Sequence, residues 1–379
     1  MQTYCCEPKC TMGKSNILFL CPYPTAIVAS QRFRFEQYFE ILKDHGFHYE
    51  VKAFTSKEGL KILQSKGKIL LKLVVLISGF ASRLFIFLKI FRYEFIFIHR
   101  EAAPIGPPII EWLIAKVFRK KIIYDFDDSI WLTDNVKQSS FQKFLKWRGK
   151  IASICRWSYK VSAGNEYLAS FARQFNHRAV VNPTTIDTEN LHNKILYKTN
   201  AQLKEENQID GIVIGWTGTY TTVKYFEQLL PVLQKIEMTY PIVKFLVIAD
   251  SVSDIPLKNL IFKKWSMATE IKDLLLADIG IMPLPDDDWA KGKCGFKALQ
   301  YMSLEIPAIV SAVGVNEKIV QHGENGFCCK TEDDWFSSIS KLILNASTRS
   351  LFGQNGRKTV VQTYSIDSNC TTFLSLFRS

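Results

Sequence analysis

Residues 291–311, KGKCGFKALQYMSLEIPAIVS, decide the fold that the sequence predicts. After a loop with two glycines and three lysines, apolar residues recur at helical spacing from Phe296 to Met302. The helix is expected to end near Glu305, because Pro307 disfavours the α region for the residue before it. The apolar residues after Pro307 are typical of a short buried strand, so the stretch is one loop, helix and strand of an α/β domain.

Three lysines surround the predicted start of this helix. Lys291, Lys293 and Lys297 oppose the helix dipole, which favours negative charge at a helix N-terminus. A bound anion would offset this, and backbone N–H groups in a glycine-containing turn would complete a phosphate site. Lys297 and Gln300 share one helical face, so one helix could hold a diphosphate and its ribose. The alternative is a solvated lysine loop before an ordinary core helix, and this stretch alone does not separate the two.

Composition sets the expected number of domains and the kind of partner. With 379 residues, 47% of them hydrophobic, the chain is too long for one ordinary core and can bury two. Residues 1–190 hold 28 Lys and Arg against 16 Asp and Glu, a net charge of +12, whereas residues 191–379 hold 20 of each. A one-sided basic half predicts an anionic partner: lipid, nucleic acid or a phosphorylated substrate.

The cysteines and the N-terminus bear on the compartment. The nine cysteines include no CxxC pair and no zinc-type Cys/His cluster, which favours reduced thiols in a cytoplasmic protein. Residues 1–14 are typical of an unstructured leader, with Met12 as an alternative start. Residues 16–21 are too short for the apolar region of a signal peptide and continue into a strand pattern, so no secretory signal is expected.

The first half opens as a doubly wound α/β domain does. A strand pattern at 15–20 leads through a loop to a helix pattern at 31–42, and ligands of such domains lie outside the carboxyl ends of the strands. Arg32 and Arg34 fall where the loop meets the helix, which makes them candidate contacts for an anionic group of the substrate. Surface arginines without a ligand are the alternative.

Charged residues follow two further predicted strands. Residues 94–99 lead to Arg100, and residues 121–124 lead to an Asp-Phe-Asp-Asp sequence that contains Asp127 and Asp128. These carboxylates could bind a metal, act as a base, or hold Arg and Lys from neighbouring loops. The sequence has no second carboxylate cluster with metal spacing, so charge pairing is expected for at least one of them.

Residues 57–92 combine bulky apolar residues with eight Lys or Arg and a single acid, Glu58. Lys72, Arg83 and Lys89 interrupt the apolar run, which argues against a membrane-spanning helix. A basic amphipathic helix in the interface of an anionic membrane fits this pattern, with its lysines reaching the headgroups. A long core helix with a basic outer face is the alternative.

The second half repeats the α/β alternation after a polar linker at 191–210. A strand pattern at 211–216 leads into a loop of small residues and then into a helix with Lys224 in its first turn. The loop, residues 217–219, is similar to a phosphate-cradling turn but has no Walker or GxGxxG spacing.

Four further stretches accompany the run at 291–311: DIGIMPL at 278–284, GENGF at 323–327, SQRFR at 30–34 and YDFDD at 124–128. Together they resemble a glycosyltransferase of the GT-B fold, close to the retaining family 4 (group 1) enzymes of bacterial surface polysaccharide assembly. The resemblance covers nearly the whole chain from about residue 15. It implies two Rossmann-like domains facing a cleft, with the nucleotide-sugar mainly on the C-terminal domain, the acceptor mainly on the N-terminal one, and no metal or other cofactor.

One position departs from this resemblance. Family members usually carry a Glu-x7-Glu motif, whose second Glu aligns with Gln300 here and whose first Glu aligns with Gly292. Gln300 can still hydrogen-bond ribose hydroxyls, but the first Glu's contact with the donor sugar is missing. Asp286, Asp287 or Asp288 could replace it, since they lie just upstream.

The sequence therefore predicts an acceptor-binding domain at 15–190, a donor-binding domain at 211–360 and a helical segment at 361–379 that crosses back to the first domain. Lys293 and Lys297 are the candidate catalytic residues, which would stabilise the charge on the leaving diphosphate. The candidate donor-binding residues are Thr217, Gly218, Thr219, Lys224, Asp286, Asp288, Gly295, Gln300 and Glu317. The candidate acceptor-binding residues are Arg32, Arg34, Arg100, Asp127 and Asp128. No metal ligands are expected.

The expected function is transfer of a sugar, with retention, from a nucleotide-diphosphate-sugar to a glycan or lipid-linked acceptor in capsule, O-antigen or exopolysaccharide synthesis. The expected location is the cytoplasmic face of the cell membrane, peripherally bound. One alternative is a GT-B-related nucleotide-sugar epimerase, which the basic segment 57–92 disfavours. The other is a non-catalytic membrane-binding or nucleic-acid-binding protein, and the sequence contains no recognisable nucleic-acid module.

Overall fold

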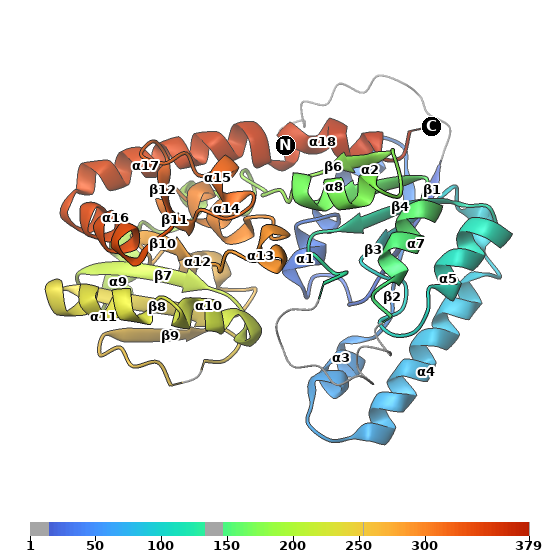
Figure 1. Cartoon of the computed structure of the whole chain (residues 1–379), viewed down its shortest axis with the longest axis horizontal. Helices are drawn as coiled ribbons and strands as arrows, with labels where there is room; N and C mark the ends of the chain where they lie inside the picture. The colour runs from blue at the N-terminus through green and yellow to red at the C-terminus, as the bar shows by residue number, and fades with distance from the viewer. Residues whose placement is uncertain (1–14, 133–146, 253, 379) are drawn as a thin grey trace. The chain divides into compact units, whose positions relative to one another are not determined.

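The computed structural model describes residues 15–132, 147–252 and 254–378, so the predicted leader at 1–14 lies outside the described residues. The chain divides into two compact units (Figure 1). Unit 1 consists of Met1–Thr184, Gly292–Cys294 and Asn369–Ser379, and unit 2 consists of Thr185–Lys291 and Gly295–Ser368. Each unit contains a six-stranded sheet whose strands are all parallel, as an α/β fold requires.

The sheet of unit 1 has the strand order β2-β1-β3-β4-β5-β6. Its strands are β1 (Asn16–Cys21), β2 (His48–Ala53), β3 (Phe95–His99), β4 (Lys121–Phe126), β5 (Lys160–Ala163) and β6 (Ala179–Val181). The central strands β1, β3 and β4 are buried along almost their whole length, because helices cover both faces of a parallel sheet. This burial explains why these strands are continuous apolar runs in the sequence.

The helices of unit 1 differ from the sequence prediction in two places. The predicted helix at 31–42 is three short elements, α1 (Ala29–Arg32), η1 (Glu36–Tyr38) and α2 (Phe39–Asp44). The basic segment 57–92 forms two helices, α3 (Lys57–Gln64) and α4 (Ile69–Ile86), because Gly67 and Lys68 take left-handed conformations between them. The other elements are η2 (Ile90–Arg92), α5 (Ile109–Trp112), the π-helical turn η3 (Leu113–Val117), α7 (Lys150–Trp157) and α8 (Glu166–Arg173).

The last residues of the chain, Asn369–Ser379, are part of unit 1. They include the end of α18 (Ile366–Ser375), where the Phe373 ring stacks on Tyr38 with centroids 4.1 Å apart. Lys160 Nζ donates to the backbone oxygen of Ser375 at 2.6 Å. The C-terminal segment thus completes the packing of the first sheet.

The sheet of unit 2 has the strand order β12-β11-β10-β7-β8-β9. Its strands are β7 (Ile212–Thr217), β8 (Val243–Ala249), β9 (Leu260–Lys264), β10 (Ile279–Met282), β11 (Ala308–Ser311) and β12 (Gly326–Cys329). Its helices are η4 (Lys194–Leu196), α9 (Asn200–Glu206), η5 (Tyr220–Thr222), α10 (Val223–Glu227), α11 (Leu230–Thr239), α12 (Glu270–Leu274), α13 (Asp288–Lys291), α14 (Phe296–Ser303), α15 (Asn316–Ile319), α16 (Glu332–Leu344), α17 (Ala346–Thr359) and η6 (Val360–Tyr364).

The predicted linker at 191–210 is an ordered part of unit 2 instead. Helix α9 begins with a capping box in which Thr199 and Gln202 satisfy each other's backbone N–H groups. Arg357 Nη1 donates to the backbone oxygen of His192 at 3.0 Å. Polar composition suggested a linker, but these polar side chains cap a helix and tie the segment to α17.

A buried charge network lies at the carboxyl ends of β3, β4 and β5 in unit 1. Arg34 and Asp125 form an ion pair in which both side chains are fully buried. Asp125 also accepts hydrogen bonds from His99 Nδ1 at 2.8 Å and from Ser162 Oγ at 2.6 Å. Arg34 also donates to the backbone oxygen of Asn182. The network joins three strands to the turn between α1 and η1 without contact with solvent.

Removal of the Asp125 charge should destabilise the protein. Burial alone would raise the pKa of Asp125, but Arg34 and His99 beside it lower this pKa well below its ordinary value. Asp125→Asn leaves Arg34 buried and unpaired, so we expect the free energy of unfolding to fall by about 3–5 kcal/mol in urea titrations at neutral pH. The matched control is Asp210→Asn, whose ion pair with Lys244 has an 88% exposed carboxylate and should change little.

The pH dependence follows from the sign of the same shift. A carboxylate with a lowered folded-state pKa stabilises the fold above its unfolded pKa of about 4, and this stability is lost as the pH falls below that value. The native chain should therefore lose stability below about pH 4, and Asp125→Asn should lose less over the same range. Equal urea midpoints for Asp125→Asn and the native chain would contradict this role.

Candidate functional site

The predicted donor loop lies at the carboxyl end of β7 in unit 2, where ligands of α/β sheets bind. Gly218 packs on the ring of Trp216, and a Cβ at position 218 would collide with that ring. Trp216 is 1% exposed, so the indole is a fixed floor beneath the loop. Lys297 Nζ lies 5.8 Å from the centroid of the same ring. The structure thus brings the two predicted donor elements together on one tryptophan.

Tyr301 holds this arrangement in place. Its hydroxyl accepts from the backbone N–H of Thr217 at 3.1 Å and donates to the backbone oxygen of Ile281 at 3.3 Å. Its ring lies on Gly280 of β10, where a Cβ would collide with it. Burial raises the pKa of Tyr301, so the phenol stays protonated and can donate. Helix α14 is therefore pinned to two neighbouring strands.

The backbone amides of the loop do not form the expected phosphate cradle. Thr217 N donates to Tyr301 Oη, Gly218 N donates to the oxygen of Ile248 at 2.9 Å, and Thr219 N donates to Thr222 Oγ1 at 2.9 Å. Because each donor already has a partner inside unit 2, this part of the prediction is corrected. Thr219 itself is exposed, and it begins η5 as a capping residue.

The start of α14 fits an anion better than this loop does. Gly295 is the N-cap with φ +69°, and a Cβ there would collide with Ile319. A glycine is therefore required, and as the N-cap it makes no side-chain hydrogen bond to the first turn of the helix. Lys297 lies in this first turn. Backbone donors and one ammonium group thus occur together at the helix N-terminus.

Two lysines of the predicted phosphate site have carboxylate partners. Lys291 Nζ lies 3.2 Å from Asp288 and 3.8 Å from Asp286. Lys293, which groups with unit 1, lies 2.7 Å from Asp128. Two of the three lysines for which a bound anion is the simplest explanation thus have carboxylate partners within the protein, and their contact with a diphosphate remains a prediction. The predicted donor contacts of Asp286 and Asp288 compete with the same ion pairs.

Asp128 belongs to a larger cluster at the carboxyl end of β4 in unit 1. Arg100 donates to Asp127 Oδ1 at 2.8 Å and to Asp128 Oδ2 at 2.9 Å. The residues next to Lys293 are bound in the same unit: Asn165 Nδ2 donates to the oxygen of Lys293 at 2.9 Å. Charge pairing, one of the alternatives for these carboxylates, is thus what the structure shows.

The remaining predicted residues lie in different settings. Gln300 is 5% exposed, and its Nε2 lies 3.3 Å from His192 Nε2, so its amide faces the interior of unit 2. Lys224 lies 5.1 Å from the ring of Tyr225. Glu317 is exposed in the first turn of α15.

The two arginines near α1 also differ from each other. Arg32 is partly exposed and lies 5.0 Å from the ring of Phe33. Arg34 is 1% exposed, and its donors are used inside unit 1. This burial leaves the predicted acceptor contact of Arg34 without support. An acceptor contact remains a prediction for Arg32.

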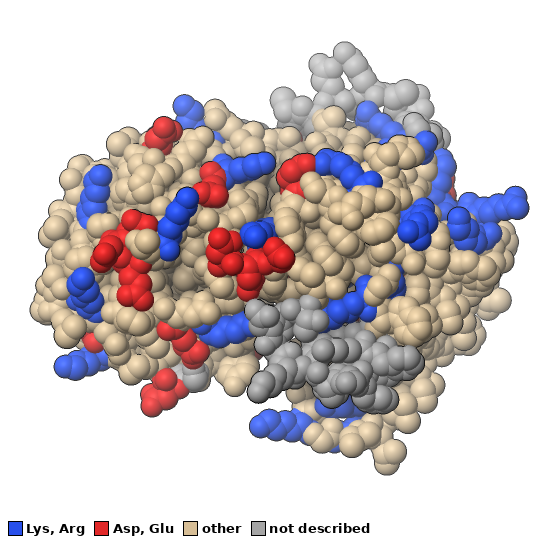
Figure 2. Space-filling model, viewed as in Figure 1, with Lys and Arg blue, Asp and Glu red and all other residues tan. Residues whose placement is uncertain are grey.

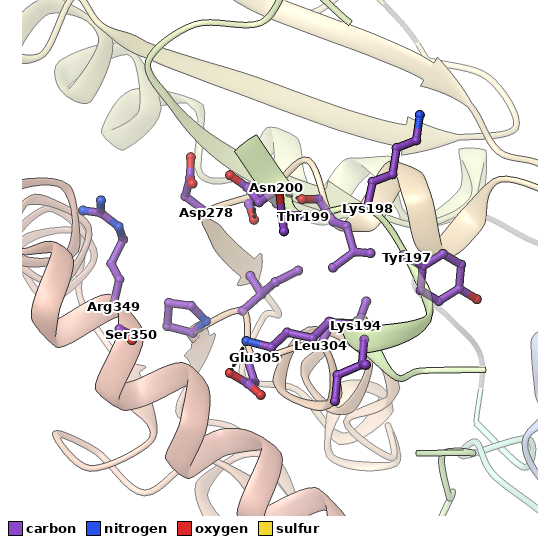
Figure 3. Close-up of a pocket in the computed structure, with 15 residues that line it drawn as sticks. Lys194, Tyr197, Lys198, Thr199, Asn200, Asp278, Leu304, Glu305, Arg349 and Ser350 are labelled. Atoms are coloured by element: carbon purple, nitrogen blue, oxygen red, sulfur yellow. Dashed lines mark hydrogen bonds and ion pairs between the residues drawn. The ribbon is translucent and has the colours of Figure 1, made fainter. Parts of the chain in front are cut away.

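A cavity of about 500 Å³ in unit 2 lies away from these residues (Figure 3). Leu275, Ala277 and Asp278 line it before β10 begins, and Glu305 to Pro307 line it before β11 begins. The cavity is therefore at the amino ends of these strands, opposite the edge where α/β sheets bind ligands. Lys194 and Glu305, which form an ion pair at 2.5 Å, close part of it. We do not assign the donor site to this cavity.

Trp216 and Tyr301 are the site residues that sequence reasoning missed. Tyr301 lies four residues after Lys297, one helical turn along α14, but its spacing also fits an ordinary core position. Trp216 ends an apolar strand and was counted as part of it. Within the described ranges, no group of three His, Cys, Asp or Glu side chains has the geometry to hold a metal ion.

The chain is similar to solved glycosyltransferase structures along nearly its full length. Sucrose-phosphate synthase from Thermosynechococcus elongatus matches with a TM-score of 0.70 and 13% identity over 96% of this chain and 98% of that one. Anabaena HepE, in complex with UDP and glucose, matches with 0.67 and 14% over 95% and 98%. A glycosyltransferase from Rickettsia africae matches with 0.67 and 14% over 96% and 98%. With the two parallel sheets, these matches confirm the predicted GT-B fold.

No curated protein matches the sequence. A family model does match part of unit 2, and it agrees with the structural comparison. Residues 199–359 match the family model described as glycosyl transferases group 1. This segment contains Trp216, Lys297 and Tyr301 together with every candidate donor residue. The chain therefore carries a glycosyltransferase group 1 domain, and this domain and the fold indicate a glycosyltransferase.

Proposed function

We propose that the protein transfers a sugar, with retention, from a nucleotide-diphosphate-sugar to a glycan or lipid-linked acceptor in bacterial polysaccharide synthesis. The observation that carries this proposal is the start of α14, where Gly295 is the N-cap and Lys297, in the first turn, lies over the ring of Trp216 at the carboxyl edge of the sheet. The UDP and glucose bound by Anabaena HepE support a nucleotide-sugar as the donor.

The chemistry requires negative charge to be stabilised as the glycosidic bond breaks. The diphosphate gains charge when the sugar leaves, and a cation aimed at it acts more strongly in the transition state than in the ground state. Lys297 and the first N–H groups of α14 are the groups proposed for this role. We assign no protein nucleophile and no metal ion, because the ammonium and the helix N-terminus supply the positive charge.

The acceptor determines where in the cell the proposed reaction takes place. A lipid-linked acceptor is held at a membrane surface, so we propose that the protein works on the cytoplasmic face of the membrane and binds there peripherally. Its partners are then the donor, the acceptor and the anionic lipid surface, with no nucleic acid. The exposed apolar side chains of helix α4 in unit 1, with exposed lysines on either side of the helix in the sequence, support this placement.

Nucleotide binding should raise the melting temperature. We expect one of UDP, GDP, ADP and CMP to stabilise the native chain, because a ligand that binds only the folded state adds about 2.7 kcal/mol at 100 times its Kd. The measurement is a thermal unfolding series with each nucleotide. If none of the four shifts the melting temperature of the native chain, the proposed donor site is wrong.

Lys297→Ala should reduce turnover by about 10²–10³ while leaving the fold intact, because one stabilising contact to the developing charge is lost. Lys297→Arg should restore part of the rate, since a planar guanidinium replaces a compact ammonium. The matched control is Lys235→Ala in α11, which removes a lysine that also lies over an aromatic ring, Phe336 at 4.3 Å. The measurement is release of the nucleoside diphosphate. Near-native turnover of Lys297→Ala would contradict the proposed role.

Lys293 needs a separate test because its ammonium group donates a hydrogen bond to Asp128. If the pair is structural, Lys293→Ala and Asp128→Asn should each lower the melting temperature, and the double variant should lower it by less than their sum. We expect this non-additivity, with a coupling energy of about 0.5–3 kcal/mol. A fall in kcat for Lys293→Ala alone, with an unchanged melting temperature, would instead assign the lysine to the diphosphate.

A further inference from the structure

Helix α4 is rich in apolar residues, yet most of it faces solvent. Within the described part of the chain, it is the one helix long and apolar enough to cross a membrane, with a mean hydropathy of 2.1. Yet just 17% of this stretch is buried in the protein. A soluble helix of this composition is normally buried, and a large exposed apolar patch marks a binding surface.

The inner side of α4 is fixed to unit 1. Arg83 is fully buried, and it donates to the backbone oxygens of Ala102 at 2.8 Å, Lys52 at 3.0 Å and Cys21 at 2.9 Å. Burial lowers the pKa of Arg83 to about 10, so the guanidinium remains charged at neutral pH. These bonds hold the last turn of α4 against the carboxyl ends of β1 and β2 and the loop after β3.

This anchor bears on whether α4 could cross a membrane. If α4 left unit 1, Arg83 would lose every one of these acceptors, and a charge in hydrocarbon is expensive. Gly79 adds a steric constraint, because a Cβ at this position would press on the ring of Phe54. The helix therefore fits a position in the plane of an interface, with its anchored side on the protein.

The outer side of α4 is apolar and continues onto the neighbouring helix. Phe87, at the end of α4, stacks on Phe118 with centroids 5.0 Å apart, and Phe91 lies 5.7 Å from Phe118. Figure 1 shows α5 next to the end of α4. The exposed apolar residues of this surface, here called the outer face, are Ile69, Leu70, Leu73, Val74, Ile77, Leu84, Phe85, Leu88, Phe91, Ile109, Trp112 and Val117.

In this region, residues 66–92 and 109–120 carry exposed charges of one sign. Its exposed ionisable side chains are the lysines and arginines Lys66, Lys68, Lys89, Arg92, Lys116 and Arg119. Within residues 66–92 and 109–120, the one acidic residue is Glu111, which is 2% exposed and accepts from the backbone N–H of Ala102. Figure 2 shows this part of unit 1 in tan and blue. Apolar side chains with a basic surround complement the headgroups and acyl chains of an anionic membrane.

We propose that the outer face docks unit 1 on an anionic lipid bilayer, with α4 and α5 lying in the interface and Arg83 turned towards the protein. The exposed apolar side chains enter the acyl boundary, Trp112 lies at headgroup level, and the lysines and arginines contact the lipid phosphates. The sequence pointed to residues 57–92 alone, and the structure adds α5 and η3. The surface is distinct from the candidate donor site, so this inference can fail while the proposed transferase activity stands.

Vesicle sedimentation tests the proposal. The full chain is mixed with phosphatidylcholine vesicles that either contain or lack phosphatidylglycerol, and the bound fraction is measured at low and high salt. We expect binding to the anionic vesicles, weaker binding at high salt, and little binding to the neutral ones. Equal binding to both kinds of vesicle, or none to either, would overturn the proposal.

Matched variants locate the surface. Leu70→Asp with Ile77→Asp should weaken vesicle binding about tenfold or more, because two side chains of the outer face no longer enter the bilayer. Met238→Asp with Leu344→Asp is the control, since these side chains are 77% and 73% exposed on helices of unit 2 and should change binding little. Lys89→Glu with Lys116→Glu should reduce binding to anionic vesicles, and Lys258→Glu should not.

Two further results would show that the outer face has a different role. If the native chain is a dimer that does not bind vesicles and Leu70→Asp with Ile77→Asp makes it a monomer, the outer face joins two copies and the proposal is wrong. If the protein stays with the vesicles after extraction at alkaline pH, α4 crosses the bilayer and the in-plane arrangement is wrong. Circular dichroism of each variant separates lost binding from lost folding. Nucleotide-dependent stabilisation of the same variants separates lost docking from a lost donor site.

Discussion

The hydroxyl group of Tyr301 is the link on which the candidate donor site depends. It joins the N–H of Thr217, at the end of β7, to the backbone oxygen of Ile281 on β10, so the loop, the sheet and α14 share one geometry. Gly280 has no side chain and so leaves room for the Tyr301 ring, and burial keeps the phenol protonated. Lys297 is one turn before Tyr301, so this link also fixes the ammonium above the Trp216 floor. A cation can stabilise a developing charge when it is held in position before the reaction begins.

Much of the fold could be predicted from the sequence because parallel strands are buried on both faces. Apolar runs at 15–20, 94–99 and 211–216 are strands for this reason. Helix breaks were harder to see. Lys68 takes a left-handed conformation at φ +54° after Gly67 and separates α3 from α4, although no proline marks the position. The segment 191–210 is polar because it caps α9 and ties to α17, and composition alone does not separate capping residues from a linker.

The position of the candidate site could be predicted from the sequence, but the ion-pair and hydrogen-bond partners of its residues could not. Spacing put a helix N-terminus with lysines at the carboxyl edge of the second sheet, and α14 is there. Spacing does not show which acceptor each cation meets. Lys293 meets Asp128, 165 residues away in the chain, and such pairs depend on how strands are ordered in space. The same limit explains the loop amides at 217–219, whose acceptors come from another strand, another helix and the loop's own Thr222.

Helix α4 inverts the usual arrangement of a surface helix, because its buried side holds a charge and its exposed side is apolar. Arg83 interrupts the apolar run in sequence, but the guanidinium lies inside unit 1 with backbone oxygens as acceptors. The charge therefore does not oppose insertion of the outer side.

Each Leu or Ile removed from water contributes about 1.5–3 kcal/mol to binding. Several such side chains together offset the loss of translational freedom on docking, about 4–15 kcal/mol. The lysines and arginines around them add about 1 kcal/mol each near an anionic surface. In the docking that we propose, apolar insertion therefore supplies the affinity, and the basic residues select anionic lipid over neutral lipid.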